Sequence, residues 1–205
     1  ALDPARWQLR TEGPGETVHV HSGFDQVLLA IPSVQAAALL RASSLVTGFA
    51  ELLDEVTVAP CWTLMVAFPQ AQQPGLPHLG PQWNAALSTH HRIAWLARES
   101  SKPQRGPVER WTVQASADWS REHLNDDPQR VAAKLLKGFA EVTGIRAEPT
   151  HAQVHRWLYA KTEKPLGTPY LLDARTGIGL CGDWCIGHRV EDGFVSGLEL
   201  ALAAA

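Results

Sequence analysis

Hydrophobic and polar positions alternate in short runs along the chain and predict a mixture of strands and helices. Near the N-terminus, Trp7 to Leu9 and Thr17 to His21 are predicted strands around a Gly-Pro turn, and Gln26 to Ala30 is a third, more apolar strand. Val34 to Leu40 then predicts a short helix. Ser33 is its expected N-cap, because a serine hydroxyl can accept from the first free N–H groups of a helix.

The middle of the chain carries four longer apolar and β-branched runs, which predict one antiparallel sheet. These runs are Val56 to Phe68, Ile93 to Arg98, Arg110 to Ser116 and Ala152 to Ala160. Between the first two runs, Pro69 to His91 is rich in Pro, Gly and Gln. We expect that segment to be a long surface excursion rather than an element.

One helix is well marked beside these strands. Asp127 is a candidate N-cap, Pro128 suits the first turn, and Gly144 ends the periodic pattern. The apolar positions that share one face are Val131, Leu135, Phe139 and Val142. The pattern predicts a sheet with a helical cover.

The last thirty residues predict a strand, a loop and a helix. Ile178 to Cys181 is a short apolar run, Gly182 to His188 is a loop, and Val190 to Ala203 has helical periodicity. The positions that recur every four residues as an apolar stripe are Phe194, Leu198 and Leu202. Gly193 and Gly197 lie in this helix, where each glycine costs about 1 kcal/mol relative to Ala. Either a closely approaching backbone or flat ligand, or a crowded core, would explain them.

The same region contains a glycine pattern with an unsuitable context. Gly177, Gly179 and Gly182 fit G-x-G-x-x-G, which binds dinucleotides only between a strand and a helix. Gly182 is followed by Asp-Trp-Cys-Ile-Gly, where no helix is expected to begin. The spacing therefore argues against a dinucleotide fingerprint at this place.

Composition narrows the class of protein. The chain is 45% hydrophobic and 19% charged, which suits a folded domain with a sizeable core. A formal charge of −3 without a basic stripe argues against a nucleic-acid partner. No run of eighteen apolar residues and no signal-peptide pattern occur, so we expect no membrane partner and a cytoplasmic location.

Metal and hydrolytic chemistry have little support in the sequence. The three cysteines, Cys61, Cys181 and Cys185, contain no C-x-x-C spacing, and buried free thiols are expected. His19 and His21 share one strand face, but no carboxylate or cysteine joins them, so no metal site is assigned. The chain lacks G-x-S-x-G and H-E-x-x-H, which gives nucleophilic hydrolysis and zinc proteolysis no basis.

A family resemblance extends over essentially the whole chain. The run from Gly182 to Cys185, followed by Arg189 to Glu191 and Ser196-Gly197, resembles the C-terminal flavin-binding signature of the renalase family, a branch of the flavin-containing amine oxidases. Further segments resemble bacterial members in the same order, namely Val27 to Pro32, Trp95 to Arg98, Ser101 to Pro103, Trp119-Ser120 and His155 to Ala160.

The resemblance implies FAD as cofactor and an α+β or α/β fold of two domains. Residues 1–45 and 171–205 would be pieces of a discontinuous FAD-binding domain, and 46–170 a substrate domain with an antiparallel sheet and covering helices. The family carries its own G-x-G-x-x-G in an earlier segment that has no counterpart here. We therefore expect a missing N-terminal segment, with this chain as the C-terminal two-thirds of a longer flavoprotein.

For the cofactor, the resemblance implies five positions around the predicted loop. Gly182 and Asp183 would approach the flavin, with Asp183 accepting from ribityl hydroxyls, although a loop-stabilising turn is the alternative. Arg189 would meet the flavin or its phosphates, or form a surface salt bridge. Val190 and Glu191 would offer backbone N–H groups at a helix start, where electron-rich groups bind.

For the substrate, four positions in the middle of the chain are candidates. Trp157 either lines a cleft or belongs to the core. Gln114 stands where many family members are expected to carry His, so substrate preference would differ. Arg98 and Lys102, together with Arg105, would meet a pyrophosphate. No catalytic residue is assigned, because a flavin supplies its own reactivity.

Three functional hypotheses follow. The resemblance implies an FAD-dependent oxidoreductase that oxidises reduced nicotinamide dinucleotides, especially misreduced isomers, by hydride transfer to the flavin. Oxidation of a small amine is the alternative within the same chemistry. In the third hypothesis the chain is a truncated, non-catalytic fragment that does not hold FAD.

Overall fold

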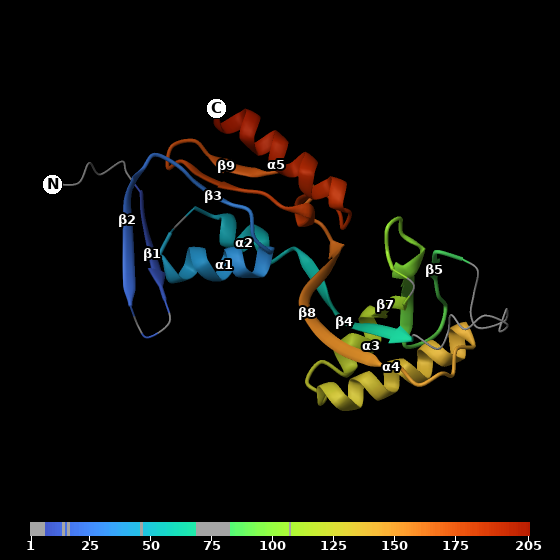
Figure 1. The fold of residues 1–205 in the computed structure, drawn as a ribbon. Coiled ribbons are helices and arrows are strands. Elements are labelled where there is room, and N and C mark those ends of the chain that lie inside the picture. The colour runs from blue at the N-terminus through green and yellow to red at the C-terminus, as the bar shows by residue number, and fades with distance from the viewer. Residues whose placement is uncertain (1–6, 14, 16, 46, 69–82, 107) are drawn as a thin grey trace. The chain divides into compact units, whose positions relative to one another are not determined.

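The computed structural model describes residues 7–13, 15, 17–45, 47–68, 83–106 and 108–205. Helices and strands are mixed, as the sequence predicted (Figure 1). The chain forms two compact units, the first from Ala1–Val58 and Thr162–Ala205 and the second from Ala59–Lys161. Among the residues described, no helix has the length and apolar character needed to cross a lipid bilayer.

The first unit contains two small sheets. Strands β1 (Trp7–Glu12) and β2 (Val18–Phe24) form an antiparallel hairpin. The second sheet has the order β3-β10-β9, built from Val27–Leu29, Ile178–Leu180 and Leu171–Asp173. β3 and β10 are parallel, whereas β10 and β9 are antiparallel. Segments from opposite ends of the sequence therefore share one sheet.

Helices complete this unit. They are α1 (Ser33–Ala42), α2 (Phe49–Leu53), the short 3₁₀ helix η3 (Asp183–Cys185) and α5 (Val190–Ala204). α1, α2, η3 and β10 contribute to one core, whose largest side chains are Leu40, Phe49, Leu53, Ile178, Leu180 and Trp184.

The prediction of Ser33 as an N-cap was wrong. Pro32 occupies the cap position, and Ser33 is the first residue of α1, fully buried. Its hydroxyl has no hydrogen-bond partner among the described residues. Pro32 is extended at the cap position, with a ψ of 141°, so the helix begins one residue earlier than predicted and takes Ser33 into its first turn.

The apolar stripe predicted on α5 does not face the core. Phe194 is 71% exposed and Leu202 is 68% exposed, whereas Ser196 and Leu200 are buried. Leu200 packs on β10 at Gly179, where a side chain would collide with it. Small residues thus allow a different face of the helix to approach the sheet, which hydrophobic periodicity alone could not indicate.

The turn after β10 depends on a glycine because of one tryptophan. The Trp184 indole folds back over Gly182 and donates to the Ile31 carbonyl at 3.0 Å. A Cβ added to Gly182 would clash with the Trp184 indole ring. Gly182 is therefore required by internal packing.

The second unit is built on a five-stranded sheet of order β5-β6-β7-β4-β8. Its strands are β4 (Thr57–Phe68), β5 (Ala85–Leu87), β6 (Ile93–Arg98), β7 (Glu109–Ala115) and β8 (His151–Lys164). The pairs β4/β7, β6/β7 and β5/β6 are antiparallel. The four predicted strands are confirmed.

The predicted excursion at Pro69 to His91 was wrong in its last part. Ala85–Leu87 forms β5, an edge strand that pairs with β6. Only three residues pair, so the run was too short to stand out as a period-two pattern. Residues 69–82 lie outside the described part of the chain.

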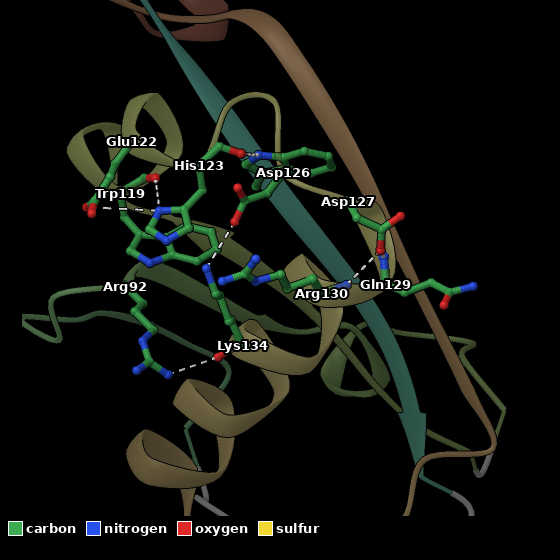
Figure 2. Close-up of polar contacts among 10 residues, drawn as sticks. Arg92, Trp119, Glu122, His123, Asp126, Asp127, Gln129, Arg130 and Lys134 are labelled. Carbon is green, nitrogen blue, oxygen red and sulfur yellow. Dashed lines mark hydrogen bonds and ion pairs between the residues drawn. The ribbon is translucent and has the colours of Figure 1, made fainter.

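Helices α3 (Ala117–Glu122) and α4 (Pro128–Thr143) accompany this sheet, together with the 3₁₀ helix η2 (Glu99–Ser101). α4 begins as predicted: the Asp127 carboxylate accepts from the backbone N–H of Gln129 at 2.9 Å and of Arg130 at 3.1 Å (Figure 2). Gly144 ends it in the left-handed conformation. The sequence signals for both ends of this helix are confirmed.

α4 covers one face of the sheet. Its buried side chains Val131, Leu135 and Phe139 join a core to which β4, β6 and β7 contribute Trp62, Leu64, Val66, Phe68, Leu96, Trp111 and Val113. The Phe139 ring stacks on Phe68 with centroids 5.4 Å apart. Successive strand residues point to opposite faces, so the residues between these core positions lie on the other side of the sheet.

Loss of the α4 cap tests the stability that this helix gives the second unit. We expect Asp127→Ala to lower the free energy of unfolding by about 1 kcal/mol, since two backbone donors lose their acceptor. Urea unfolding measures this change. Asp127→Asn should retain most of the stability, and Glu148→Ala, at an exposed position beyond α4, is the matched control. Equal losses for Asp127→Asn and Asp127→Ala would contradict a capping role.

The packing of Trp184 gives a second prediction. Gly182→Ala should displace the indole and break its bond to Ile31, lowering the free energy of unfolding by about 1–3 kcal/mol. Gly197→Ala is the control, because no atom lies within 4 Å of its would-be Cβ. Removing that helical glycine should raise stability by about 0.5–1 kcal/mol. Similar effects of the two substitutions in urea unfolding would refute the packing argument.

Candidate functional site

In the first unit, the five predicted cofactor positions follow β10. The Gly182 N–H donates to the Ser196 hydroxyl at 2.9 Å, and that hydroxyl donates to the Pro169 carbonyl at 2.6 Å. Ser196 is completely buried in α5. This relay fixes the loop against the helix, so the groups on the loop and on the helix start are held in one arrangement.

The Asp183 carboxylate stabilises the loop and keeps one oxygen that can bind a ligand. One carboxylate oxygen accepts from the Trp184 N–H at 2.9 Å, and the Asp183 carbonyl accepts from the N–H groups of Ile186 and Gly187. The loop-stabilising alternative is therefore observed. Asp183 is half-buried, and its other carboxylate oxygen accepts no hydrogen bond within the described part of the chain.

The start of α5 presents donors. Its first turn is fixed by the Arg189 N–H, which donates to the Asp192 carboxylate at 2.9 Å. The backbone N–H groups of Val190 and Glu191 precede the first intrahelical bonds and so stay free. The Arg189 guanidinium has no partner among the residues described. The alternative role of Arg189, a surface salt bridge, is thus not formed in the described part of the chain. The guanidinium and the helix start together suit an electron-rich or anionic group.

The cysteines next to this loop are unsuited to nucleophilic roles. Cys181 and Cys185 are buried, and all three thiols are free. Burial raises the pKa of the Cys185 thiol to about 11 and also raises that of Cys181. Among the described residues, no three His, Cys, Asp or Glu side chains gather in a way that could hold a metal ion.

In the second unit, two of the predicted substrate residues, Gln114 and Trp157, lie on the sheet face opposite α4, here called the open face. Register places Trp95, Gln114 and Thr63 side by side across β6, β7 and β4. The next row in the same direction consists of Ala97, Thr112 and Met65. Gln114 is exposed, whereas Trp95 is half-buried. Together they form a polar and aromatic surface.

Trp157 belongs to this same face. The Arg156 guanidinium lies 5.8 Å from the Trp62 ring centre and donates to the Leu124 carbonyl at 2.6 Å, so Arg156 points to the α4 side. Strand alternation then puts Trp157 on the open face. Trp157 is 54% exposed and its ring meets that of His155 edge to face at 4.3 Å. It is therefore a surface residue and no part of the core.

A cavity of about 600 Å³ opens on the β5-β6-β7 part of the open face. It is lined by Trp95, Thr112, Gln114, Asn84, Arg98, Glu99 and Lys102 among others, and Trp157 is not among the lining residues. Three of the four predicted substrate positions thus share one cavity. Sequence reasoning missed Trp95, although its period-two relation to Ala97 in β6 was the signal that could have identified it.

The cations of this cavity are already paired. Arg98 holds the buried Glu109 carboxylate with two hydrogen bonds of 2.7 and 3.0 Å, which raises the Arg98 pKa. Lys102 pairs with Glu99 at 2.5 Å and thereby lowers the pKa of that carboxyl. The Gln114 and Asn84 amides, in contrast, have no partner among the residues described. The cavity therefore offers neutral amides and an indole more readily than free positive charge.

Comparison with solved structures shows the fold. The chain is similar to a putative protoporphyrinogen oxidase from Exiguobacterium sp. 255-15, with 17% identity and a TM-score of 0.68 over 100% of this chain and 45% of that one. It is also similar to cyclohexylamine oxidase from Brevibacterium oxydans IH-35A, with 13% identity and a TM-score of 0.67 over 98% of this chain and 46% of that one. An oxidoreductase from Methanosarcina mazei has 14% identity and a TM-score of 0.58 over 96% of this chain and 49% of that one. The chain thus spans less than half the length of these structures.

A family model gives the assignment. Residues 8–204 match the model of the flavin containing amine oxidoreductases. The match includes both compact units, with the loop after β10 and the open face. The chain therefore belongs to the family of flavin containing amine oxidoreductases.

Proposed function

We propose that this chain forms part of an FAD-dependent oxidoreductase in which the first unit contacts the flavin and the open face contacts the substrate. Membership of the flavin containing amine oxidoreductases supports a flavin cofactor. The single observation that carries the proposal is the set of unpaired polar groups after β10. These groups are held in place by the Gly182–Ser196–Pro169 relay.

The groups in the first unit fit parts of FAD. The free carboxylate oxygen of Asp183 can accept from a ribityl hydroxyl. The N–H groups of Val190 and Glu191 at the start of α5 can donate to an electron-rich edge of the flavin, as free N–H groups at other helix starts do. Arg189 adds a positive charge beside them. Bound flavin would supply a two-electron acceptor. Gly182 contributes through the loop geometry that Trp184 imposes.

For the substrate, we propose a reduced nicotinamide dinucleotide, in particular a misreduced isomer. The cavity on the open face supports recognition of the nicotinamide end: Trp95 offers an aromatic surface, and the Gln114 amide can both donate to and accept from a carboxamide. Because Arg98 and Lys102 are paired with carboxylates, the proposal assigns the pyrophosphate no fixed cation in this cavity.

A small amine is the second candidate. Two structural neighbours are named cyclohexylamine oxidase and putrescine oxidase. The exposed pair His155 and Trp157 favours it, since an aromatic face attracts an ammonium group. The open face thus offers one region suited to an amide-bearing ring and another suited to a cation.

Titration of FAD into the purified 205-residue chain tests the cofactor site. We expect flavin absorbance to be retained after gel filtration, and Asp183→Ala to weaken binding about tenfold because one charge-assisted hydrogen bond is lost. Asp118→Ala, at an exposed position of the second unit, should bind like the unchanged chain. A colourless chain would refute flavin binding by these residues alone and support the fragment hypothesis.

Anaerobic reduction of the flavin-loaded protein tests the substrate. Misreduced nicotinamide dinucleotides should bleach the flavin absorbance, and Gln114→Ala should raise the KM for them about tenfold with a smaller effect on kcat. Gln35→Ala, at an exposed position of α1, is the control. Bleaching by cyclohexylamine or putrescine but by no dinucleotide would replace the first candidate with the second.

A further inference from the structure

The cavity on the open face contains a carboxylate in addition to the Trp95 indole and the Gln114 amide. Glu99 belongs to η2, directly after β6, and lines the cavity together with Thr112 and Lys102. The Thr112 hydroxyl donates to one Glu99 oxygen at 3.1 Å, and the Lys102 ammonium binds the other at 2.5 Å. The Glu99 side chain is thus fixed by these partners, while 23% of it stays exposed.

This carboxylate is charged and has further acceptor positions. The hydrogen bond from Lys102 lowers the pKa of Glu99, and Thr112 and Arg105 act in the same direction. A carboxylate offers about four acceptor positions, of which Thr112 and Lys102 occupy about half. As an ionised group, Glu99 can accept from a hydroxyl but repels a phosphate. The chemistry therefore favours a ligand that carries hydroxyls at this point.

The register of the strands sets the separation between this carboxylate and the Gln114 amide. Trp95 pairs with Gln114, and the next row on the same face is Ala97 with Thr112. Such rows, two residues apart along a strand, are separated by about 7 Å. Ala97 presents only a methyl group to the cavity between them. In a dihydronicotinamide riboside a similar length separates the carboxamide from the ribose hydroxyls, so both ends can bind at once.

We propose that Glu99 is a specificity-determining residue, which accepts hydrogen bonds from the ribose hydroxyls of a reduced nicotinamide nucleoside. The inference rests on the proposed nicotinamide substrate and adds recognition of the sugar that follows the ring. Trp95 and Gln114 contact the ring and its carboxamide, and Thr112 fixes the position of the carboxylate. A bare nicotinamide ring lacks these hydroxyls, so Glu99 selects the ribosylated ring.

Binding of two reduced nicotinamides tests this role in the 205-residue chain without flavin. Dihydronicotinamide riboside and N-methyl-dihydronicotinamide share the ring and the carboxamide, but only the riboside carries ribose. The fluorescence of the dihydropyridine ring reports the binding of both. We expect the riboside to bind about tenfold more tightly, because its hydroxyls donate to a charged acceptor. Glu99→Gln keeps an acceptor for Thr112 but not the charge, and should remove most of this preference.

Further variants separate recognition of the sugar from recognition of the ring. Thr112→Val should weaken binding of the riboside alone, since it releases the Glu99 carboxylate. Gln114→Ala should weaken both compounds by the same factor, since both carry the carboxamide. Glu148→Gln removes an exposed carboxylate on the α4 side of the second unit and should change neither affinity.

The outcomes distinguish the role of Glu99 from the proposed substrate. Equal binding of the two compounds, or an equal loss for both in Glu99→Gln, would overturn the ribose contact and leave the nicotinamide substrate intact. Binding of neither compound would overturn the ribose contact together with that substrate. A chain that does not hold flavin still gives an answer, because FAD takes no part in these measurements.

Discussion

The hydrogen bond from the Trp184 indole to the Ile31 carbonyl is the constraint on which the first unit depends. It joins residues 153 positions apart, at the junction of β3 with α1 and at the turn after β10. The ring occupies the space where any side chain at position 182 would lie. The loop that follows, with Asp183 and the start of α5, takes its path from this contact. A tryptophan and a glycine thus place the candidate flavin groups without touching a flavin themselves.

The second unit follows a different rule, which is strand alternation with one covered face. Phe139 and Leu135 of α4 bury one side of the sheet, and every second residue of β4, β6 and β7 is then left for the other side. Trp95 and Gln114 are side by side there because β6 and β7 pair in that register. The same strands that stabilise the core therefore present the candidate substrate residues, and a shift by one residue would exchange the two sets.

Local signals in the sequence were sufficient where the structure is local. The N-cap, the apolar face and the final glycine of α4 all lie within one helix, and the sequence predicted each of them. Pairing across the sheet was not visible: Arg98 meets Glu109 eleven positions away, and only the β6/β7 register brings them together. The role proposed for Arg98 from its charge alone ignored that partner. Flavin contact by Asp183 and Arg189 stays a prediction, since their free groups are compatible with it.

Periodicity also identifies a face without telling what covers it. Phe194, Leu198 and Leu202 do form a stripe on α5, but Gly179 and Leu200 fix the helix through another side. The free energy lost by leaving such side chains in water is about 25 cal/mol for each Å² of apolar surface. Several such side chains are exposed on α5, because the contact of Leu200 with Gly179 decides which side of the helix is covered. The exposure of each side chain therefore depends on contacts between elements that hydrophobic periodicity along one helix does not contain.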